Sequence, residues 1–356
     1  MIGRGLLAAT VTFIISAAAS AAPCTTAGPS CAEMVGIAGK PGHALVYRSY
    51  SLDARNAAIT RGVIMVHGAS RDADNYYRHL LAAAFLAGAL EDTVLISPRF
   101  ASNEGECKDA LAQGEFNWHC SSRNDTWRTG GAAADSQVTS FDVADELLRR
   151  LGRKDVFPNL RTLVVAGHSA GGQFVTRYEM SNQMHDRLPV QPTYVVANPS
   201  SYAYLDALRP TVSALPANYA SAAPGYIAPL PANPPAAFEP FANADSCTVY
   251  DSWPYGLNAR NGYASRLSDD QLKKQLISRP TTYLLGELDI LPLYGFDSSC
   301  PAMAQGPTRL ARGLAYTKYV NEKFGAQHKA VVVPACGHNA RCMIGADVAL
   351  PIMFPK

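Results

Sequence analysis

The sequence predicts an α/β fold in which helices cover both faces of a mostly parallel, doubly wound sheet. Three observations predict it. Apolar runs rich in Val, Ile and Leu alternate with helix-like segments along the chain. Several of these runs are apolar at nearly every position, which is typical of strands buried on both faces. One of them, at residues 163–166, passes through a glycine-rich turn directly into a helical segment.

The first part of the chain predicts three strands and two helices. Residues 44–50 alternate as in a half-buried strand, whereas residues 62–68 and 93–97 are apolar runs of the kind found inside parallel sheets. Apolar side chains recur at helical spacing over residues 74–90 and 141–151. Before the second helix lies a long polar loop, and loops of this length are usually functional or locally stapled.

The second part repeats the same alternation. After the strand at 163–166 we expect a helix that ends near residue 184 and then a strand at 193–197. A strand at 281–285, a helix at 307–324 and a last strand at 330–333 complete the sheet. The order of strand, helix and strand predicts right-handed crossovers between parallel strands.

The alternation stops between residues 200 and 279. This stretch is rich in Pro, Ala, Tyr and Asn, but it contains too many aromatic residues for a disordered linker. We expect an inserted cap at about residues 201–280. It would lie between the strand at 193–197 and the strand at 281–285 that leads to an acidic residue.

Composition and the N-terminus limit the classes of function. The chain has 356 residues, of which 48% are hydrophobic and 17% charged, with a formal net charge of +2. Such a balance gives no reason to expect nucleic acid or an anionic membrane as a partner. Residues 1–21 have the pattern of a signal peptide, with Arg4, an apolar stretch and a small-x-small site at Ala19-Ser20-Ala21. The apolar stretch is short and rich in alanine, so we expect no stable membrane insertion. The mature chain would comprise residues 22–356 and would be secreted or periplasmic.

The eight cysteines all follow the expected cleavage site. An even number in an exported protein predicts disulfides, although sequence cannot choose among the possible connectivities. Loop closure favours near neighbours, which suggests these pairs: Cys24–Cys31, Cys107–Cys120, Cys336–Cys342 and, by remainder, Cys247–Cys300. No Cys-x-x-Cys or paired histidine spacing indicates a metal site, and no phosphate or dinucleotide motif indicates a cofactor, so we expect none.

The stretch Gly167-His168-Ser169-Ala170-Gly171 is the strongest chemical signal. A strand before it and a helix after it are typical of a nucleophile elbow, in which a sharp turn lifts the serine hydroxyl above the strand ends. The glycines two residues before and after Ser169 leave room for the turn. The side chain of His168 would point away from that of Ser169 and serve in packing.

A serine hydroxyl needs a histidine base that is itself oriented by a carboxylate. With such an elbow the acid and then the histidine follow later strands. His338 follows the last strand, whereas the alternative, His328, precedes it. Asp289 follows the strand at 281–285 and is the favoured acid, with Glu287 and Asp297 as alternatives.

A second pair of groups would stabilise a developing oxyanion. The backbone N–H of Ala170 faces outward at the start of the helix, and the loop after residues 62–66 should supply another. That loop begins with His67-Gly68, so we expect the backbone N–H of Ala69 to be the donor, with Ser70 as the alternative. His67 itself more often has a structural part in such a turn.

Together, the serine pentad, His67-Gly68, Asp289 and His338 resemble the α/β-hydrolase superfamily of serine hydrolases. The resemblance covers roughly Ala44 to the C-terminus. The segments Ala197–Tyr202 and Ala304–Gly313 are similar to those of little-characterised exported bacterial members. The resemblance implies an α/β-hydrolase fold and a Ser169, Asp289 and His338 triad, but it implies no particular substrate.

The sequence thus predicts a serine hydrolase that cleaves carboxylic esters through an acyl-enzyme, on a small-molecule or polymeric ester. An amidase or peptidase with the same triad is the nearest alternative, and a catalytically inactive binding protein is a third. The cap aromatics, with Trp118 and Trp127, suggest an apolar or aromatic substrate group. Packing within a core would explain the same residues equally well.

Overall fold

The computed structural model describes residues 22–120, 126–211, 237–293 and 295–356. Over these residues eight strands form one sheet in the order β1-β2-β4-β3-β5-β6-β9-β10. The strands are β1 (Ala32–Gly36), β2 (His43–Arg48), β3 (Arg61–Val66), β4 (Thr93–Pro98), β5 (Thr162–His168), β6 (Pro192–Ala197), β9 (Thr281–Gly286) and β10 (Lys329–Val333). From β4 to β10 all neighbours are parallel, whereas β2 pairs antiparallel with both β1 and β4.

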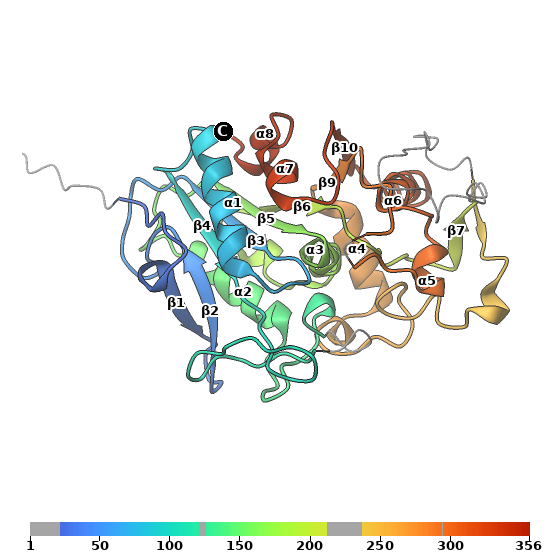
Figure 1. Ribbon diagram of the computed structural model, residues 1–356, viewed down its shortest axis with the longest axis horizontal. Coiled ribbons are helices and arrows are strands. Elements are labelled where there is room, and N and C mark those ends of the chain that lie inside the picture. The colour runs from blue at the N-terminus through green and yellow to red at the C-terminus, as the bar shows by residue number, and fades with distance from the viewer. Residues whose placement is uncertain (1–21, 121–125, 212–236, 294) are drawn as a thin grey trace, which may run out of the picture.

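Helices cover both faces of this sheet (Figure 1). They are α1 (Ala73–Leu86), α2 (Ser140–Leu151), α3 (Ala170–Ser181), α4 (Asp269–Ser278), α5 (Cys300–Met303), α6 (Arg309–Phe324), α7 (Ala340–Gly345) and α8 (Leu350–Met353). Alternate residues of the central strands serve the two faces. Val63 and Met65 join a core with α1, α7 and α8, whereas Ile64 and Val66 join a larger core with α2, α3 and α6. This alternation accounts for the continuous apolar runs in the sequence.

The predicted fold class is confirmed, and the differences are local. The helix expected to reach residue 90 ends at Leu86, because Gly88 adopts a left-handed backbone with φ 63°. The antiparallel edge strand β1 and the helices α4, α5, α7 and α8 were not expected. They are short, with four to ten residues, and a few turns of helix give too weak a periodicity to predict.

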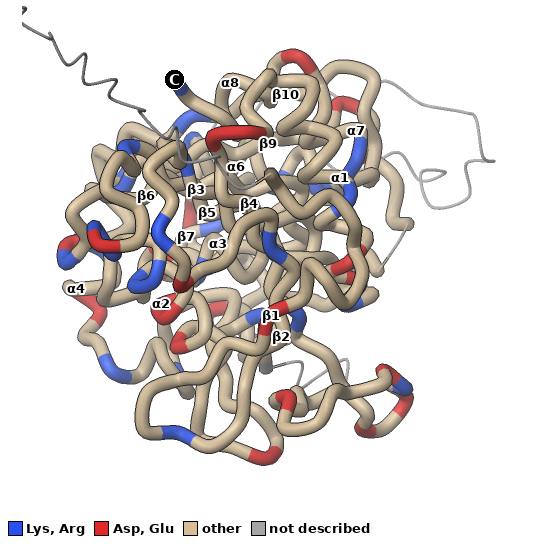
Figure 2. The backbone as a smooth tube through the Cα atoms, turned by 90° about the vertical axis from the view of Figure 1, so that its left-hand side faces the viewer, with Lys and Arg blue, Asp and Glu red and all other residues tan. Residues whose placement is uncertain are grey.

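Several expectations concern residues that the structure does not describe. The predicted signal peptide, residues 1–21, lies wholly outside the described residues, as do residues 212–236 of the expected cap. Within the described ranges, none of the helices combines the length and apolarity needed to cross a bilayer. Acidic and basic residues are interspersed along the described chain (Figure 2).

The eight cysteines lie at disulfide distance in the four pairs that loop closure suggested. Their Cα atoms are 5.6 Å apart in Cys24–Cys31, 5.8 Å in Cys336–Cys342, and 6.0 Å in Cys107–Cys120 and Cys247–Cys300. No cysteine among the described residues is left unpaired. Three of the pairs therefore close short local loops, and the fourth joins the chain before α4 to the first residue of α5.

We call residues 198–211 and 237–280 the cap segment, and residues 287–293 and 295–308 the acid loop. Regular structure is sparse in both. The cap segment contains α4 and a separate two-stranded ribbon of β7 (Leu208–Pro210) and β8 (Phe238–Pro240). Buried arginines bond its backbone carbonyls instead: Arg177 donates to Pro254 and Arg209 to Tyr250.

Trp118 and Trp127 lie in the larger core, with 1% and 0% of their surfaces exposed. Trp127 stacks on Phe100, and Trp118 meets Phe100 edge on. Of the two roles that the sequence allowed for these tryptophans, the structure therefore favours core packing over contact with a substrate.

Candidate active site

The turn between β5 and α3 places Ser169 at its apex. Ser169 has φ 59° and ψ −117°, a backbone that side chains rarely adopt. The flanking glycines make this turn possible. A Cβ on Gly167 would lie 2.2 Å from the carbonyl oxygen of Gly171, and a Cβ on Gly171 would lie 2.1 Å from that of Val66. Strand, turn and helix therefore pack too closely for any other residue at these two positions.

Ser169, His338 and Asp289 form one chain of hydrogen bonds. The Oγ of Ser169 lies 2.9 Å from Nε2 of His338, and Nδ1 of His338 lies 2.7 Å from Oδ2 of Asp289. The side chains of His338 and Asp289 are only 6% and 2% exposed. An ionised carboxylate can only accept, so Nδ1 carries the proton and Nε2 is left to accept from the serine hydroxyl.

The three residues come from separate strand ends. Ser169 follows β5, Asp289 follows β9 by three residues, and His338 follows β10 by five. Because these strands are parallel, their carboxyl ends lie along one edge of the sheet, and residues far apart in the sequence meet there. The structure thus brings together the serine, acid and histidine that the sequence singled out.

The alternative acids and base are engaged elsewhere. His328 lies between the hydroxyl of Tyr283 and the carbonyl of Leu276. Glu287 accepts from the backbone N–H of Ala335, and Asp297 accepts from the hydroxyl of Tyr255. These contacts leave Asp289 and His338 as the acid and base nearest to Ser169.

The two expected oxyanion donors flank the elbow. Ala170 is the first residue of α3, and Ala69 lies in the loop after β3, where a Cβ on the preceding Gly68 would lie 3.7 Å from Cβ of Ser169. The hydrogen bonds of the described residues include none from the backbone N–H of Ala69 or Ala170. Both donors are therefore available to a bound group.

His67 orients the peptide that carries the Ala69 N–H. Its Nε2 accepts from the backbone N–H of Phe100, so its Nδ1 is left to donate to the carbonyl of Gly68 at 2.8 Å. Because a peptide is planar and trans, fixing the Gly68 carbonyl aims the Ala69 N–H in the opposite direction. Burial lowers the pKa of His67 to about 4, so the ring is neutral and keeps this pattern at neutral pH.

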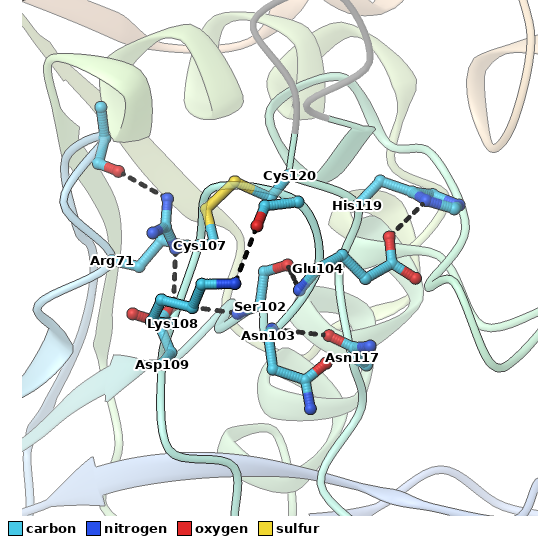
Figure 3. Close-up of a disulfide and its surroundings, with 12 residues drawn as sticks. Arg71, Ser102, Asn103, Glu104, Cys107, Lys108, Asp109, Asn117, His119 and Cys120 are labelled. Atoms are coloured by element: carbon cyan, nitrogen blue, oxygen red, sulfur yellow. Dashed lines mark hydrogen bonds and ion pairs between the residues drawn. A yellow bond between two sulfur atoms is a disulfide. The ribbon is translucent and has the colours of Figure 1, made fainter.

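A second anchor joins the loop after β3 to the loop stapled by Cys107 and Cys120. Arg71 donates from Nε to Asp109 at 2.6 Å and from Nη1 to the carbonyl of Ala69 at 3.1 Å. Asp109 also accepts from the backbone N–H of Ser102 (Figure 3). The long loop before α2 is thus stapled, and it supports the Ala69 loop from outside.

His168 lies against the histidine of the site. Its ring centroid is 4.8 Å from that of His338, and its Nδ1 lies 2.9 Å from the hydroxyl of Tyr76. Burial lowers the pKa of His168 well below 6.5, so the ring is uncharged. His168 thus packs behind His338, a contact that sequence reasoning did not predict.

Two further residues support the acid loop, and sequence reasoning missed both. Asn198, at the end of β6, accepts from the backbone N–H of Gly286 and donates to the carbonyl of Gly337, so it ties the strand end before Asp289 to the residue before His338. Arg309, the first residue of α6, donates to Asp289. Both residues lie in the two segments that resembled exported hydrolases, which was the available signal.

The chain is similar to known proteins over most of its length. A model described as "Alpha/beta hydrolase family" matches residues 63–348. A search of curated proteins found no match. Among solved structures, the chain is similar to LpqC, a poly(3-hydroxybutyrate) depolymerase from Bordetella parapertussis, with 18% identity, TM-score 0.56, and 88% of this chain and 84% of that chain covered. It is also similar to poly(aspartic acid) hydrolase-1 from Sphingomonas sp. KT-1, with 21% identity, TM-score 0.56, and 91% and 98% covered. At these identities the likeness concerns the fold.

In the described ranges, no group of three or more His, Cys, Asp or Glu side chains is placed to hold a metal ion.

Proposed function

The chain belongs to the alpha/beta hydrolase family, and from this premise we propose that it is a serine hydrolase that cleaves carboxylic esters. The observation that carries the proposal is the hydrogen-bonded chain from Asp289 through His338 to Ser169, with distances of 2.7 Å and 2.9 Å. A nucleophile, a base and an orienting acid in this order are the requirements for activating a serine hydroxyl.

In the proposed reaction Ser169 Oγ attacks the ester carbonyl while His338 Nε2 takes the hydroxyl proton. The negative charge on the carbonyl oxygen is stabilised by the N–H groups of Ala69 and Ala170. The intermediate collapses as the C–O bond to the alcohol breaks, and His338 returns the proton to the leaving alcohol. A water molecule, deprotonated by His338, then releases the acid and restores Ser169.

The proposed setting is outside the cytoplasm. Four cysteine pairs at disulfide distance suit an oxidising compartment, and residues 1–21 have the pattern of an export signal. Substrates met there include polymeric as well as small esters. One of the two similar structures is named for a polyester, poly(3-hydroxybutyrate), and the other for a polyamide, poly(aspartic acid), so polymeric esters and polymeric amides are both worth testing.

The test compares wild type, Ser169→Ala and a matched control, Ser181→Ala. Ser181 lies on the same helix, is buried, and its Oγ has no partner among the described residues. We expect wild type and Ser181→Ala to hydrolyse a short p-nitrophenyl ester and to react with a fluorophosphonate. Ser169→Ala should lose at least about 1,000-fold in kcat and all labelling.

Parallel assays separate the alternatives. A p-nitroanilide substrate tests amide cleavage, and a long-chain p-nitrophenyl ester compares acyl lengths. Labelling with turnover of the amide but not of either ester would contradict ester specificity and favour an amidase. Folded wild-type protein that neither labels nor turns over any substrate would contradict the enzyme proposal and favour a binding protein.

A further inference from the structure

We propose that Arg309 is a positioning residue for Asp289 and His338. It holds the carboxylate of Asp289 in one orientation and lowers the pH at which His338 takes up a proton. The inference rests on the proposed function. It goes beyond it by adding a charged group that the triad mechanism does not contain.

The contacts of Arg309 hold its guanidinium in one orientation. Nη1 lies 3.2 Å from Oδ1 of Asp289, Nε donates to Oγ of Ser200 at 2.7 Å, and Nη2 donates to the carbonyl of Leu293 at 2.9 Å. The side chain is 0% exposed. Three donors thus reach two partners in the acid loop and one in the cap segment, and the planar fork cannot turn without breaking at least one of these bonds.

The two oxygens of Asp289 have different partners. Oδ2 faces His338, and Oδ1 faces Arg309. The backbone of α6 adds a further link, because the N–H of Leu310 donates to the carbonyl of Asp289 at 3.3 Å. Asp289 is therefore held from the first turn of α6 by both a side chain and a main-chain group.

Burial makes the charge of Arg309 necessary. Asp289 is 2% exposed, and a buried charge is costly unless it is paired and hydrogen-bonded. The guanidinium of Arg309 supplies the opposite charge at Oδ1 and leaves Oδ2 to orient His338 and to stabilise the imidazolium that forms when His338 accepts the serine proton.

The positive charge of Arg309 also affects the protonation of His338, because both side chains contact the carboxylate of Asp289. A cation beside Asp289 disfavours a second cation on the imidazole, so His338 should protonate at a lower pH than it would without Arg309. This extends activity towards acidic pH, because the base must be neutral to accept the serine proton.

Other titratable groups also face Asp289 and His338. His168, from β5, lies against His338 but is neutral, because burial lowers its pKa well below 6.5. Tyr202, from the cap segment, is neutral because burial raises its pKa well above 10. Asp297, in the acid loop, and Arg312, on α6, also act on this cluster, and both are engaged by other partners.

Arg312 offers a matched control. It lies one turn further along α6, is equally buried, and packs over the same Phe296 ring as Arg309. Its donors go to backbone carbonyls, those of Gly306 and Asp297 among them, and to Sδ of Met303, but to no carboxylate among the described residues. Replacing it removes a buried guanidinium without changing the partners of Asp289.

The experiment measures kcat/KM of a short p-nitrophenyl ester against pH for wild type, Arg309→Gln, Arg309→Lys and Arg312→Gln. Fluorophosphonate titration counts the active sites in each sample, so that loss of folded protein is separated from loss of rate. We expect Arg309→Gln to lose about 10-fold or more in kcat with KM within about twofold. Its acidic midpoint should rise by about one pH unit, and Arg309→Lys should restore most of that shift.

Arg312→Gln should move the wild-type midpoint far less than Arg309→Gln does, whatever its effect on stability, because Arg312 contacts no oxygen of Asp289. The proposal is overturned if Arg309→Gln keeps that midpoint, or if both glutamine variants shift it alike, because Arg309 would then serve the fold alone. A wild type that neither turns over nor labels would instead contradict the proposed function, and the role of Arg309 would fall with it.

Discussion

The nucleophile and the acid of the site are held in two different ways. Ser169 sits on the central sheet, where each strand bonds to its neighbours in a regular ladder from β4 to β10. Asp289 sits in the acid loop beside the cap segment, where guanidinium groups from α3 and α6 bond the carbonyls of Pro254, Leu293 and Asp297. In the first region the backbone carbonyls accept hydrogen bonds from backbone N–H groups, and in the second region they accept hydrogen bonds from long side chains.

The two regions therefore fix the positions of the site residues by different means. In the sheet these positions are fixed by close backbone packing, which tolerates no extra atoms. Around the acid they are fixed by the geometry of buried arginine forks. Single substitutions should therefore lower the free energy of unfolding for different reasons in the two regions. Three substitutions test this difference.

The largest effect is expected for Gly171→Ala in the sheet region. Its Cβ would lie 2.1 Å from the carbonyl oxygen of Val66 and 2.6 Å from that of His67, and both atoms belong to the backbone. We expect loss of soluble folded protein or a fall of about 5 kcal/mol in the free energy of unfolding. Gly345→Ala, where nothing lies within 4 Å, is the control and should be neutral. Denaturant unfolding of both variants measures this; a stable Gly171→Ala would show that the elbow is loosely packed.

A smaller effect is expected for Arg177→Met in the region held by arginines. The change removes the donor to the carbonyls of Gln173 and Pro254, which are then left without that bond in the interior. We expect a loss of about 3 kcal/mol in the free energy of unfolding. The control is Arg78→Met on α1, whose ion pair with Asp74 is exposed and should contribute at most about 0.5 kcal/mol. Equal losses in the two variants would remove the distinction between the regions.

The smallest effect concerns Asp145, at the junction of the two regions. It accepts hydrogen bonds from Tyr178 on α3 and Tyr263 of the cap segment. Burial raises the pKa of Asp145 from 3.8 to about 6, and these two hydrogen bonds oppose the shift in part. Between the two values the folded protein keeps the proton while the unfolded chain releases it, so the free energy of unfolding falls as pH rises through this window.

Asp145→Asn should remove this dependence, because an amide does not titrate. Across pH about 4 to 6 the difference in free energy of unfolding between wild type and variant should change by about 2 kcal/mol. Asp155→Asn is the control: Asp155 is exposed, and Arg153 lowers its pKa, so it titrates below the window. Parallel unfolding curves for wild type and Asp145→Asn at every pH would show that Asp145 is not the source of the slope.

The same contrast explains what the sequence could predict. Ser169 was found because a strand, a glycine-flanked serine and a helix are adjacent in the chain, and the close backbone contacts require those glycines. Asp289 and His338 were found because parallel strands end at one edge. Both inferences use local pattern and sheet topology, which are properties of the central sheet.

Arg309 could not be found in this way. The chain has 31 Lys and Arg residues, and although the resemblance singled out residues 304–313, it does not separate Arg309 from Arg312 or give either a role. Its role depends on a fold that brings Ser200, Leu293 and Asp289 around one side chain. Asn198 was missed for the same reason, because its two partners come from the ends of two other strands.

The left-handed backbone of Ser169 also limits which nucleophiles this position can hold. At φ 59° a side chain with one substituent on Cβ fits, but one with two substituents clashes with its own backbone. Serine and cysteine meet this condition, and threonine does not. The turn that exposes the hydroxyl therefore also limits the nucleophile to a primary alcohol or a thiol, because the branched side chain of threonine does not fit this backbone.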